Sequence, residues 1–301
     1  MAFLFPLFSF ILIWQVFCIA VKMCEGRCNM ELVQPYFEFA TYQYQKKPIM
    51  SHGIAQYYHY CRNCQELDKV HAIPDGCVDM YFEKSSSGVQ VKACGTVLKS
   101  TSLDTQLGNE YFGIRFMPGV LPSNLKVRME DLVEQELDLE DILTNKNLSR
   151  RIEEKSDWRE CIRLYVEDYL HSLQSTHFSA EDKNHIRLFE YIKGQIVSGM
   201  GNIRVKELAE NAGYSTRYIN MLFRQYIGIS PKTFSEIIKF QYAVQLIDAH
   251  QEDRLTKIGL DIGYFDQAHF IKEFKKYSMV TPNEYRKMLK KHNALQQIRV
   301  C

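Results

Sequence analysis

Two short segments near the C-terminal end carry side chains of the kinds that read base pairs in DNA. Arg217 and Asn220 follow Ser215 in the first segment, and His269 and Lys272 occupy the second, about fifty residues later. An arginine can bind guanine O6 and N7 with two hydrogen bonds, and an asparagine can bind adenine N6 and N7. Such chemistry requires a helix that holds these side chains at its surface in the major groove.

The first segment has the pattern of a helix, a tight turn and a second helix. Val205–Ala209 predicts the first helix, and Gly213 permits the positive φ that the turn needs. Ser215 predicts an N-cap for a second helix over Thr216–Tyr226. The apolar residues of that helix share one face: Ile219, Leu222 and Phe223. The opposite face would carry the polar residues, as in a recognition helix.

The second segment repeats this pattern. Leu255–Ile262 predicts a first helix, Gly263 a turn, and Asp266 an N-cap for a helix over Gln267–Tyr277. The expected core residues of that helix are Phe270, Ile271 and Phe274. Between the copies, Pro231–Ala249 predicts one long helix with proline at its first position.

These motifs resemble the DNA-binding domain of the AraC/XylS family of transcription regulators. The resemblance covers roughly residues 183–290, through Gly228–Pro231, Asp261–Tyr264, Phe270–Tyr277 and Thr281–Arg286. It implies two recognition helices held by a linker helix on double-stranded DNA, about one helical turn apart. It also implies RNA polymerase as a partner, and a homodimer is a further expectation.

Candidate contacts follow from position within this resemblance. The base-contact candidates are Thr216, Arg217, Asn220 and Met221 in the first recognition helix and Gln267, His269 and Lys272 in the second. The phosphate candidates, which would position the protein without specifying sequence, are Ser215, Arg224, Lys232, Lys275 and Lys276. Alternatives stay open, because Met221 could pack in the core and His269 could be a half-buried structural residue. Lys275 and Lys276 could belong only to a solvated face.

The charge is unevenly distributed along the 301 residues, although the net charge is only +1. From Glu181 to Cys301 there are 19 basic and 13 acidic residues, a net of +6, whereas residues 1–180 carry a net of −5. A chance distribution is one explanation. The other is a sensor domain joined to a part that binds a polyanion.

The N-terminal half predicts strands instead of helices, so the expected class is α+β multidomain. The expected strands, separated by turn signals, are Gly53–Tyr60, Val78–Phe82, Val89–Ala93 and Tyr111–Phe116. They indicate an antiparallel β-sandwich or barrel that resembles a cupin-like sensory module. Asp75, Asp79 and Arg115 are candidates for lining an effector pocket for an unknown small molecule. The alternative, which we favour, is turn capping and a structural ion pair.

We expect four parts along the chain. Residues 1–29 form an apolar leader, residues 30–173 a β-rich effector or dimerisation domain ending in helices, and residues 174–182 a linker. Residues 183–292 form the AraC-type DNA-binding domain. Residues 1–21 lack charge and are long enough to anchor the protein in a membrane. We favour instead a chain that starts at Met23 or Met30 and a cytoplasmic protein that does not bind membranes.

The nine cysteines include one Cys-x-x-Cys motif, Cys61 and Cys64, with His52, His59 and His71 nearby. These residues are weak candidates for a metal site or a redox switch, and free thiols are the alternative. A cysteine-based DNA alkyl-repair or sensor protein and a membrane-tethered regulator are alternative functions. The sequence has no Pro-Cys-His-Arg-like run, phosphate loop, HExxH or GxSxG, so we expect no enzyme and no cofactor.

Overall fold

A computed structural model of the chain describes residues 32–41, 44–62, 69–155 and 157–300. The expected leader and membrane anchor, and Cys64 of the Cys-x-x-Cys motif, lie outside the described residues. In the part of the chain that is described, no helix is long and apolar enough to cross a bilayer.

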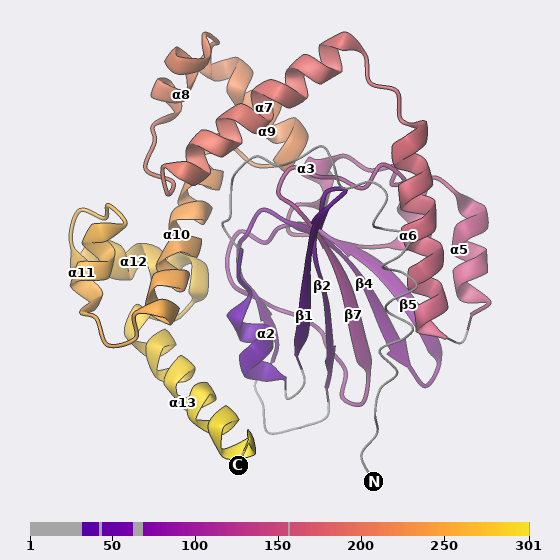
Figure 1. Cartoon of the computed structure of the whole chain (residues 1–301), viewed down its shortest axis with the longest axis horizontal. Helices are drawn as coiled ribbons and strands as arrows, with labels where there is room; N and C mark the ends of the chain where they lie inside the picture. The colour runs from indigo at the N-terminus through magenta and orange to yellow at the C-terminus, as the bar shows by residue number, and fades with distance from the viewer. Residues whose placement is uncertain (1–31, 42–43, 63–68, 156, 301) are drawn as a thin grey trace. The chain divides into compact units, whose positions relative to one another are not determined.

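Six strands form one antiparallel sheet in the order β1-β2-β7-β4-β5-β8 (Figure 1). The strands of this sheet are β1 Gln45–Ser51, β2 Ile54–Cys61, β4 Val78–Ser85, β5 Gly88–Cys94, β7 Glu110–Phe116 and β8 Glu136–Asp138. A two-stranded ladder of β3 His71–Ala72 and β6 Thr101–Ser102 lies apart from it. The four expected strands are present, which confirms the antiparallel β-domain. The short or edge strands β1, β3, β6 and β8 were not expected from the sequence.

Aromatic side chains cover both faces of the sheet, because successive strand residues point to opposite sides. On one face, Phe82 and Phe116 pack against Tyr165 and Tyr169, with ring centroids 6.0 and 5.2 Å apart. Both tyrosines belong to helix α6, Trp158–Ser175, so the apolar side of this helix is part of the core.

The other face of the sheet carries Tyr58, Tyr60 and Tyr111. Phe37 of the short helix α2, Pro35–Ala40, packs edge-on against Tyr58 and Tyr60. The sheet is therefore enclosed by α6 on one side and by α2 with neighbouring loops on the other.

The segment between the sheet and α6 contains less helix than its pattern suggests. Leu125–Leu137 has mixed helical character in sequence, but only α3, Met129–Leu132, is helical there. Residues Glu136–Asp138, which follow, form β8, because they pair with β5. Two further helices, α4 Leu139–Ile142 and α5 Lys146–Glu153, lead to α6.

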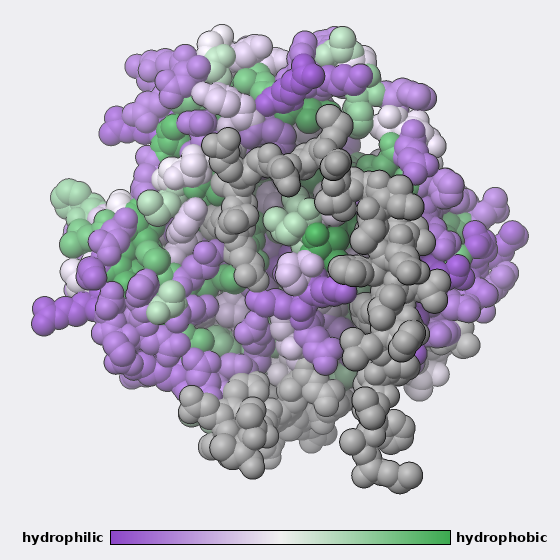
Figure 2. Space-filling model, in the orientation of Figure 1, coloured by the Kyte–Doolittle hydropathy of each residue, from purple (hydrophilic) through white to green (hydrophobic). Residues whose placement is uncertain are grey.

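Among the described residues, every regular element after residue 179 is a helix, as the sequence indicates. The helices are α7 Ala180–Ser198, α8 Val205–Ala212, α9 Thr216–Ile227, α10 Pro231–Ala249, α11 Leu255–Asp261, α12 Gln267–Ser278 and α13 Pro282–Val300. The long helix α10 packs on both recognition helices, since Phe234 contacts Phe223 of α9 and Phe240 contacts Phe274 of α12. Its ten buried residues make α10 the shared core of the two helix-turn-helix motifs. The surface of this region that Figure 2 shows is mainly hydrophilic, with small hydrophobic areas.

One buried amide joins α10 to the N-terminal part of the chain. The Gln241 side chain is fully buried and accepts a hydrogen bond from Val33 N at 2.9 Å. Its Nε2 donates to Pro74 O at 2.7 Å. A buried amide is stabilising only when its polar atoms are paired, so these bonds hold the N-terminal segment and α10 together.

Candidate nucleic-acid interface

The two helix-turn-helix motifs share the same turn geometry and the same backbone hydrogen bond at the turn. Gly213 and Gly263 both have positive φ, +73° and +88°. In each turn the following tyrosine donates its backbone N–H to a carbonyl five residues earlier, at 3.0 Å for Tyr214 and 2.9 Å for Tyr264. This hydrogen bond closes the end of the first helix and redirects the chain into the recognition helix.

The N-caps of both recognition helices are the predicted ones. Ser215 Oγ accepts from Tyr218 N at 3.2 Å, and Asp266 Oδ1 accepts from His269 N at 2.7 Å. Each cap satisfies one backbone N–H at the helix start and so stabilises the first turn of the helix.

In α9 the expected inner face is buried and the expected outer face is accessible. Ile219, Leu222 and Phe223 are fully buried, whereas Thr216, Arg217 and Arg224 are exposed. Met221 is 46% exposed and does not pack in the core. Asn220 is half-buried, and its Nδ2 donates to Thr216 O at 2.8 Å. The Asn220 amide must turn away from its own helix before it can bind a base.

In α12 the base-contact candidates are exposed as well. Gln267, His269 and Lys272 all reach the surface, so His269 is not the half-buried residue of the alternative interpretation. The His269 ring packs edge-on against Tyr264, with ring centroids 5.5 Å apart. Gln267 Oε1 accepts from Thr256 Oγ1 at 2.9 Å, which orients its amide. Ile271, expected in the core, is only half-buried.

The phosphate candidates differ in whether their charge is already neutralised. Lys276 Nζ lies 3.0 Å from Glu236 Oε2 and 2.9 Å from Tyr277 Oη. Partial burial lowers the pKa of Lys276, but these bonds outweigh it and hold the pKa above its usual value. Lys232 is 4.0 Å from the same glutamate. Among the described residues, Arg224 and Lys275 have no ion-pair partner, so their charge is available to a polyanion.

An exposed aromatic residue at the second turn was not among the expected contacts. Phe265 is 87% exposed, although it lies between buried Tyr264 and the N-cap Asp266. The corresponding residue of the first motif is Ser215. The sequence signal that could have identified Phe265 as a contact is therefore an aromatic residue at a position where the other motif has a polar one. An apolar side chain beside a recognition helix can contact a thymine methyl group.

The outer face of α9 borders a hollow of about 900 Å³. Arg217, Asn220 and Met221 line one side of it, and Arg128 and Glu130 line the other. The first recognition helix therefore lies beside Arg128 and Glu130, two charged residues of the N-terminal half.

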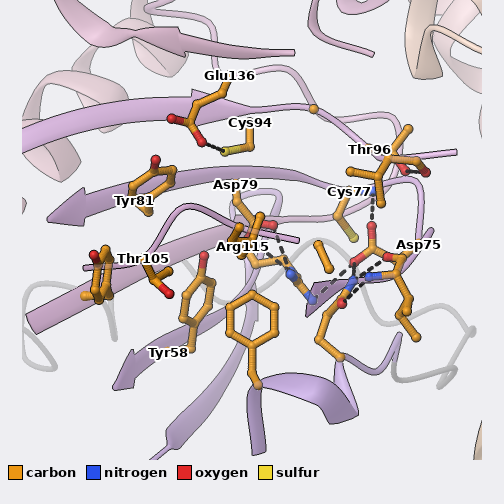
Figure 3. A pocket seen from close by; sticks show the side chains of 18 of the residues that line it. Tyr58, Asp75, Cys77, Asp79, Tyr81, Cys94, Thr96, Thr105, Arg115 and Glu136 are labelled. Atoms are coloured by element: carbon orange, nitrogen blue, oxygen red, sulfur yellow. Dashed lines mark hydrogen bonds and ion pairs between the residues drawn. The ribbon is translucent and has the colours of Figure 1, made fainter. Parts of the chain in front are cut away.

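The three effector-pocket candidates meet on one face of the sheet (Figure 3). Arg115 Nη1 lies 3.2 Å from Asp75 Oδ2, and Arg115 donates two hydrogen bonds to Asp79. Asp75 also accepts from Cys77 N at 2.9 Å and from Gln34 Nε2 at 2.8 Å. These residues thus form a turn cap and a structural ion pair, as in the favoured alternative. Burial raises the pKa of Asp79, and Arg115 partly offsets this.

The same three residues also line a cavity of about 60 Å³. Its walls include Tyr58, Tyr60, Cys94 and Glu136. A single water needs only about 10–15 Å³ of such space, so the cavity has room for several waters or one small molecule.

The cysteines of the described segments are not activated nucleophiles. Burial raises the pKa of Cys61, Cys77, Cys94 and Cys161, which keeps each thiol protonated near neutral pH. Nucleophilic repair needs a thiolate, which a raised pKa disfavours. Cys61 lies near His59 and Glu110, a grouping that the Cys-x-x-Cys motif did not suggest.

Comparison with known proteins identifies two matching families. A helix-turn-helix domain family matches residues 208–288, and a domain of unknown function (DUF6597) matches residues 42–138. An uncharacterized HTH-type transcriptional regulator of Haemophilus influenzae is 39% identical over 83 residues, 28% of each chain. The lactose operon transcription activator of Staphylococcus xylosus is 29% identical over 85 residues, 28% of this chain and 30% of that protein.

The chain spans less than a third of the length of these relatives. Among solved structures, ToxT from Vibrio cholerae aligns over 81% of this chain and 98% of its own, with 13% identity and a TM-score of 0.41.

Proposed function

We propose that this chain, which carries a helix-turn-helix domain of the AraC/XylS family, is a sequence-specific transcription regulator that binds double-stranded DNA through α9 and α12. One observation carries the proposal: two N-capped helices, each after a positive-φ glycine, are held on the same linker helix. Paired recognition helices of this kind suit successive segments of the major groove. RNA polymerase as a partner and a homodimer follow from the family resemblance and belong to the same proposal.

The proposed roles divide by side-chain chemistry. Arg217 reads guanine and Asn220 reads adenine, while Thr216 and Met221 supply smaller contacts beside them. Gln267, His269 and Lys272 read the second segment. Ser215, Arg224 and Lys275 contact phosphates, and Lys232 and Lys276 do so only where phosphate competes with Glu236.

The decisive experiment locates the binding sites and then tests Arg217. Genome-wide footprinting with the purified full chain should identify discrete sites. Arg217→Ala should weaken binding to such a site by roughly 1–3 kcal/mol and relax selectivity at one base pair. Arg163→Ala is the control, because Arg163 is exposed on α6 and pairs with Glu167. Equal losses on specific and random DNA would make Arg217 a backbone contact, and an absence of discrete sites would refute sequence-specific binding.

We also propose that the cavity beside Arg115 binds the small-molecule effector. Arg115 is the only basic side chain among the described residues that line it, and two carboxylates already engage it. An anionic ligand would therefore lack a free cation. The Tyr58 and Tyr60 hydroxyls make no hydrogen bond with any described residue, and their rings flank the space. Aromatic faces near acidic groups suit a small ligand that is cationic or rich in hydrogen-bond donors.

Thermal unfolding tests this ligand class separately from DNA binding. Ethylammonium and tetramethylammonium should raise the melting temperature, whereas acetate should not, because ligands that bind only the folded state stabilise it. Tyr60→Phe, which keeps the ring and removes the hydroxyl, should reduce the shift with ethylammonium. Stabilisation by acetate alone would refute the assigned ligand class and leave the DNA-binding proposal intact.

A further inference from the structure

His59, Cys61 and Glu110 form a cluster of metal-ligating side chains at one end of the sheet. His59 and Cys61 are two residues apart on β2, so both point to the same face. Glu110 of β7 is the cross-strand partner of Cys61. The imidazole nitrogen, the thiol sulfur and the carboxylate oxygen all lie within 4.8 Å of one another. Among the described residues, no other group of three such side chains comes as close.

The spacing suits a transition-metal ion after small side-chain rotations. Tetrahedral ligands at about 2.0–2.3 Å from zinc lie about 3.3–3.8 Å from each other. His59 Nε2 and Glu110 Oε1 are already 3.9 Å apart. A nitrogen, a sulfur and an oxygen ligand together favour zinc or a similar divalent metal over calcium or magnesium.

The surroundings support this role. Lys84 Nζ contacts Glu110 Oε2 at 3.0 Å, while Oε1 of the same carboxylate faces His59. A partner of this kind orients a metal-ligating carboxylate. All three side chains are half-buried, so an ion can reach them from solvent.

We propose that His59, Cys61 and Glu110 bind one divalent transition-metal ion of the zinc class, with a further coordination position open to water. On binding, the Cys61 thiol loses its proton to solvent and its sulfur becomes a thiolate ligand, so the step involves no oxidation. The cluster lies on the α6 side of the sheet, whereas the alternate residues Tyr58 and Tyr60 face the cavity. The metal site is therefore separate from the proposed effector pocket and does not depend on the proposed function.

Cobalt binding to the chelator-treated full chain tests the site, because a thiolate bound to Co²⁺ gives a charge-transfer absorption band. We expect one Co²⁺ per chain with this band, and displacement of the cobalt by Zn²⁺. Cys61→Ser should remove the band, and His59→Gln or Glu110→Gln should weaken binding at least about 10-fold. Cys94→Ser is the matched control, because Cys94 also lies beside a carboxylate, Glu136 at 3.9 Å, without belonging to such a cluster.

A second measurement keeps the test independent of folding defects. Zn²⁺ should raise the melting temperature of the wild type and of Cys94→Ser, but not of Cys61→Ser. Retention of the cobalt band and affinity in both His59→Gln and Glu110→Gln would overturn the proposal. A second result would also overturn the proposal: loss of the cobalt band in Cys64→Ser together with unchanged cobalt affinity in Glu110→Gln. The Cys-x-x-Cys motif would then be the metal site.

Discussion

Arg115 of β7 binds Asp79 of β4 through two parallel hydrogen bonds, from Nε at 3.0 Å and from Nη2 at 2.9 Å. The two residues are direct cross-strand partners, so the sheet register itself sets this pairing. Asp75, which precedes β4, approaches Arg115 from the side at 3.2 Å. The buried Arg115 guanidinium thus links the central strands β4 and β7 with each other and with the turn before β4.

Removal of Arg115 should strongly destabilise the folded chain. Arg115→Ala leaves the carboxylates of buried Asp75 and partly buried Asp79 without their cation, and the loss of a buried partner costs roughly 3–5 kcal/mol. Urea unfolding monitored by circular dichroism measures this loss. Arg128→Ala is the matched control, because Arg128 also forms paired bonds with an aspartate, Asp131, but at the exposed surface. A loss for Arg115→Ala no larger than that for the control would contradict this account.

Lys275 and Lys276 should contribute unequally to DNA binding. The logarithm of the DNA-binding constant falls linearly with the logarithm of the salt concentration. Each phosphate contact makes this slope steeper by about 0.9. Lys275→Gln should reduce the slope by about this amount, because Lys275 has no ion-pair partner in the described segments. Lys276→Gln should change it less, since Glu236 already neutralises Lys276. Titrations from low to physiological salt compare the two, and equal slopes would show that phosphate displaces Glu236.

Phe265 should contribute to DNA binding without contributing to stability. Its side chain is 87% exposed, so Phe265→Ala removes little packing from the free protein. Burial of a phenylalanine side chain against DNA is worth roughly 1.5–3 kcal/mol, which Phe265→Ala should lose. Phe178→Ala is the control, as Phe178 is an exposed phenylalanine outside the helix-turn-helix motifs. Unchanged affinity for a specific site would exclude Phe265 from the interface.

Asp248 should make the folded chain less stable as the pH rises from about 4 to 6. Burial is the main cause that raises the pKa of Asp248 to about 6; the Tyr285 hydrogen bond and Lys46 lower the pKa, and Glu38 adds to the rise, within this net value. The unfolded pKa is about 3.9, so the folded chain holds a proton that the unfolded chain releases in this range. The stabilisation is therefore complete below pH 4 and lost as the pH rises through 6.

Asp248→Asn tests this assignment, because the amide oxygen can still accept from Tyr285 Oη, now 2.8 Å from Asp248 Oδ1. Near pH 4 the variant should match the wild type. At pH 7 it should be more stable by at most about 3 kcal/mol. Denaturant unfolding at both pH values measures the difference, and a constant difference between them would rule out titration of Asp248.

The sequence by itself was enough to locate the two helix-turn-helix motifs, including their caps and turns. Ser215, Asp266, Gly213 and Gly263 act on backbone groups within five residues of themselves. Helical periodicity likewise assigned Phe223 to the inner face and Arg217 to the outer face. These features are local, so a pattern in the chain is sufficient to predict them.

Only the tertiary structure decided which distant side chains meet. Strand register brings Glu110 beside Cys61 and Arg115 beside Asp79, and helix packing sets Glu236 against Lys276. The sequence suggested Cys64 as the partner of Cys61 because Cys64 is close along the chain. A shift of one residue in register would turn every side chain of a strand to the other face, and no local pattern fixes that register across 36 or more residues.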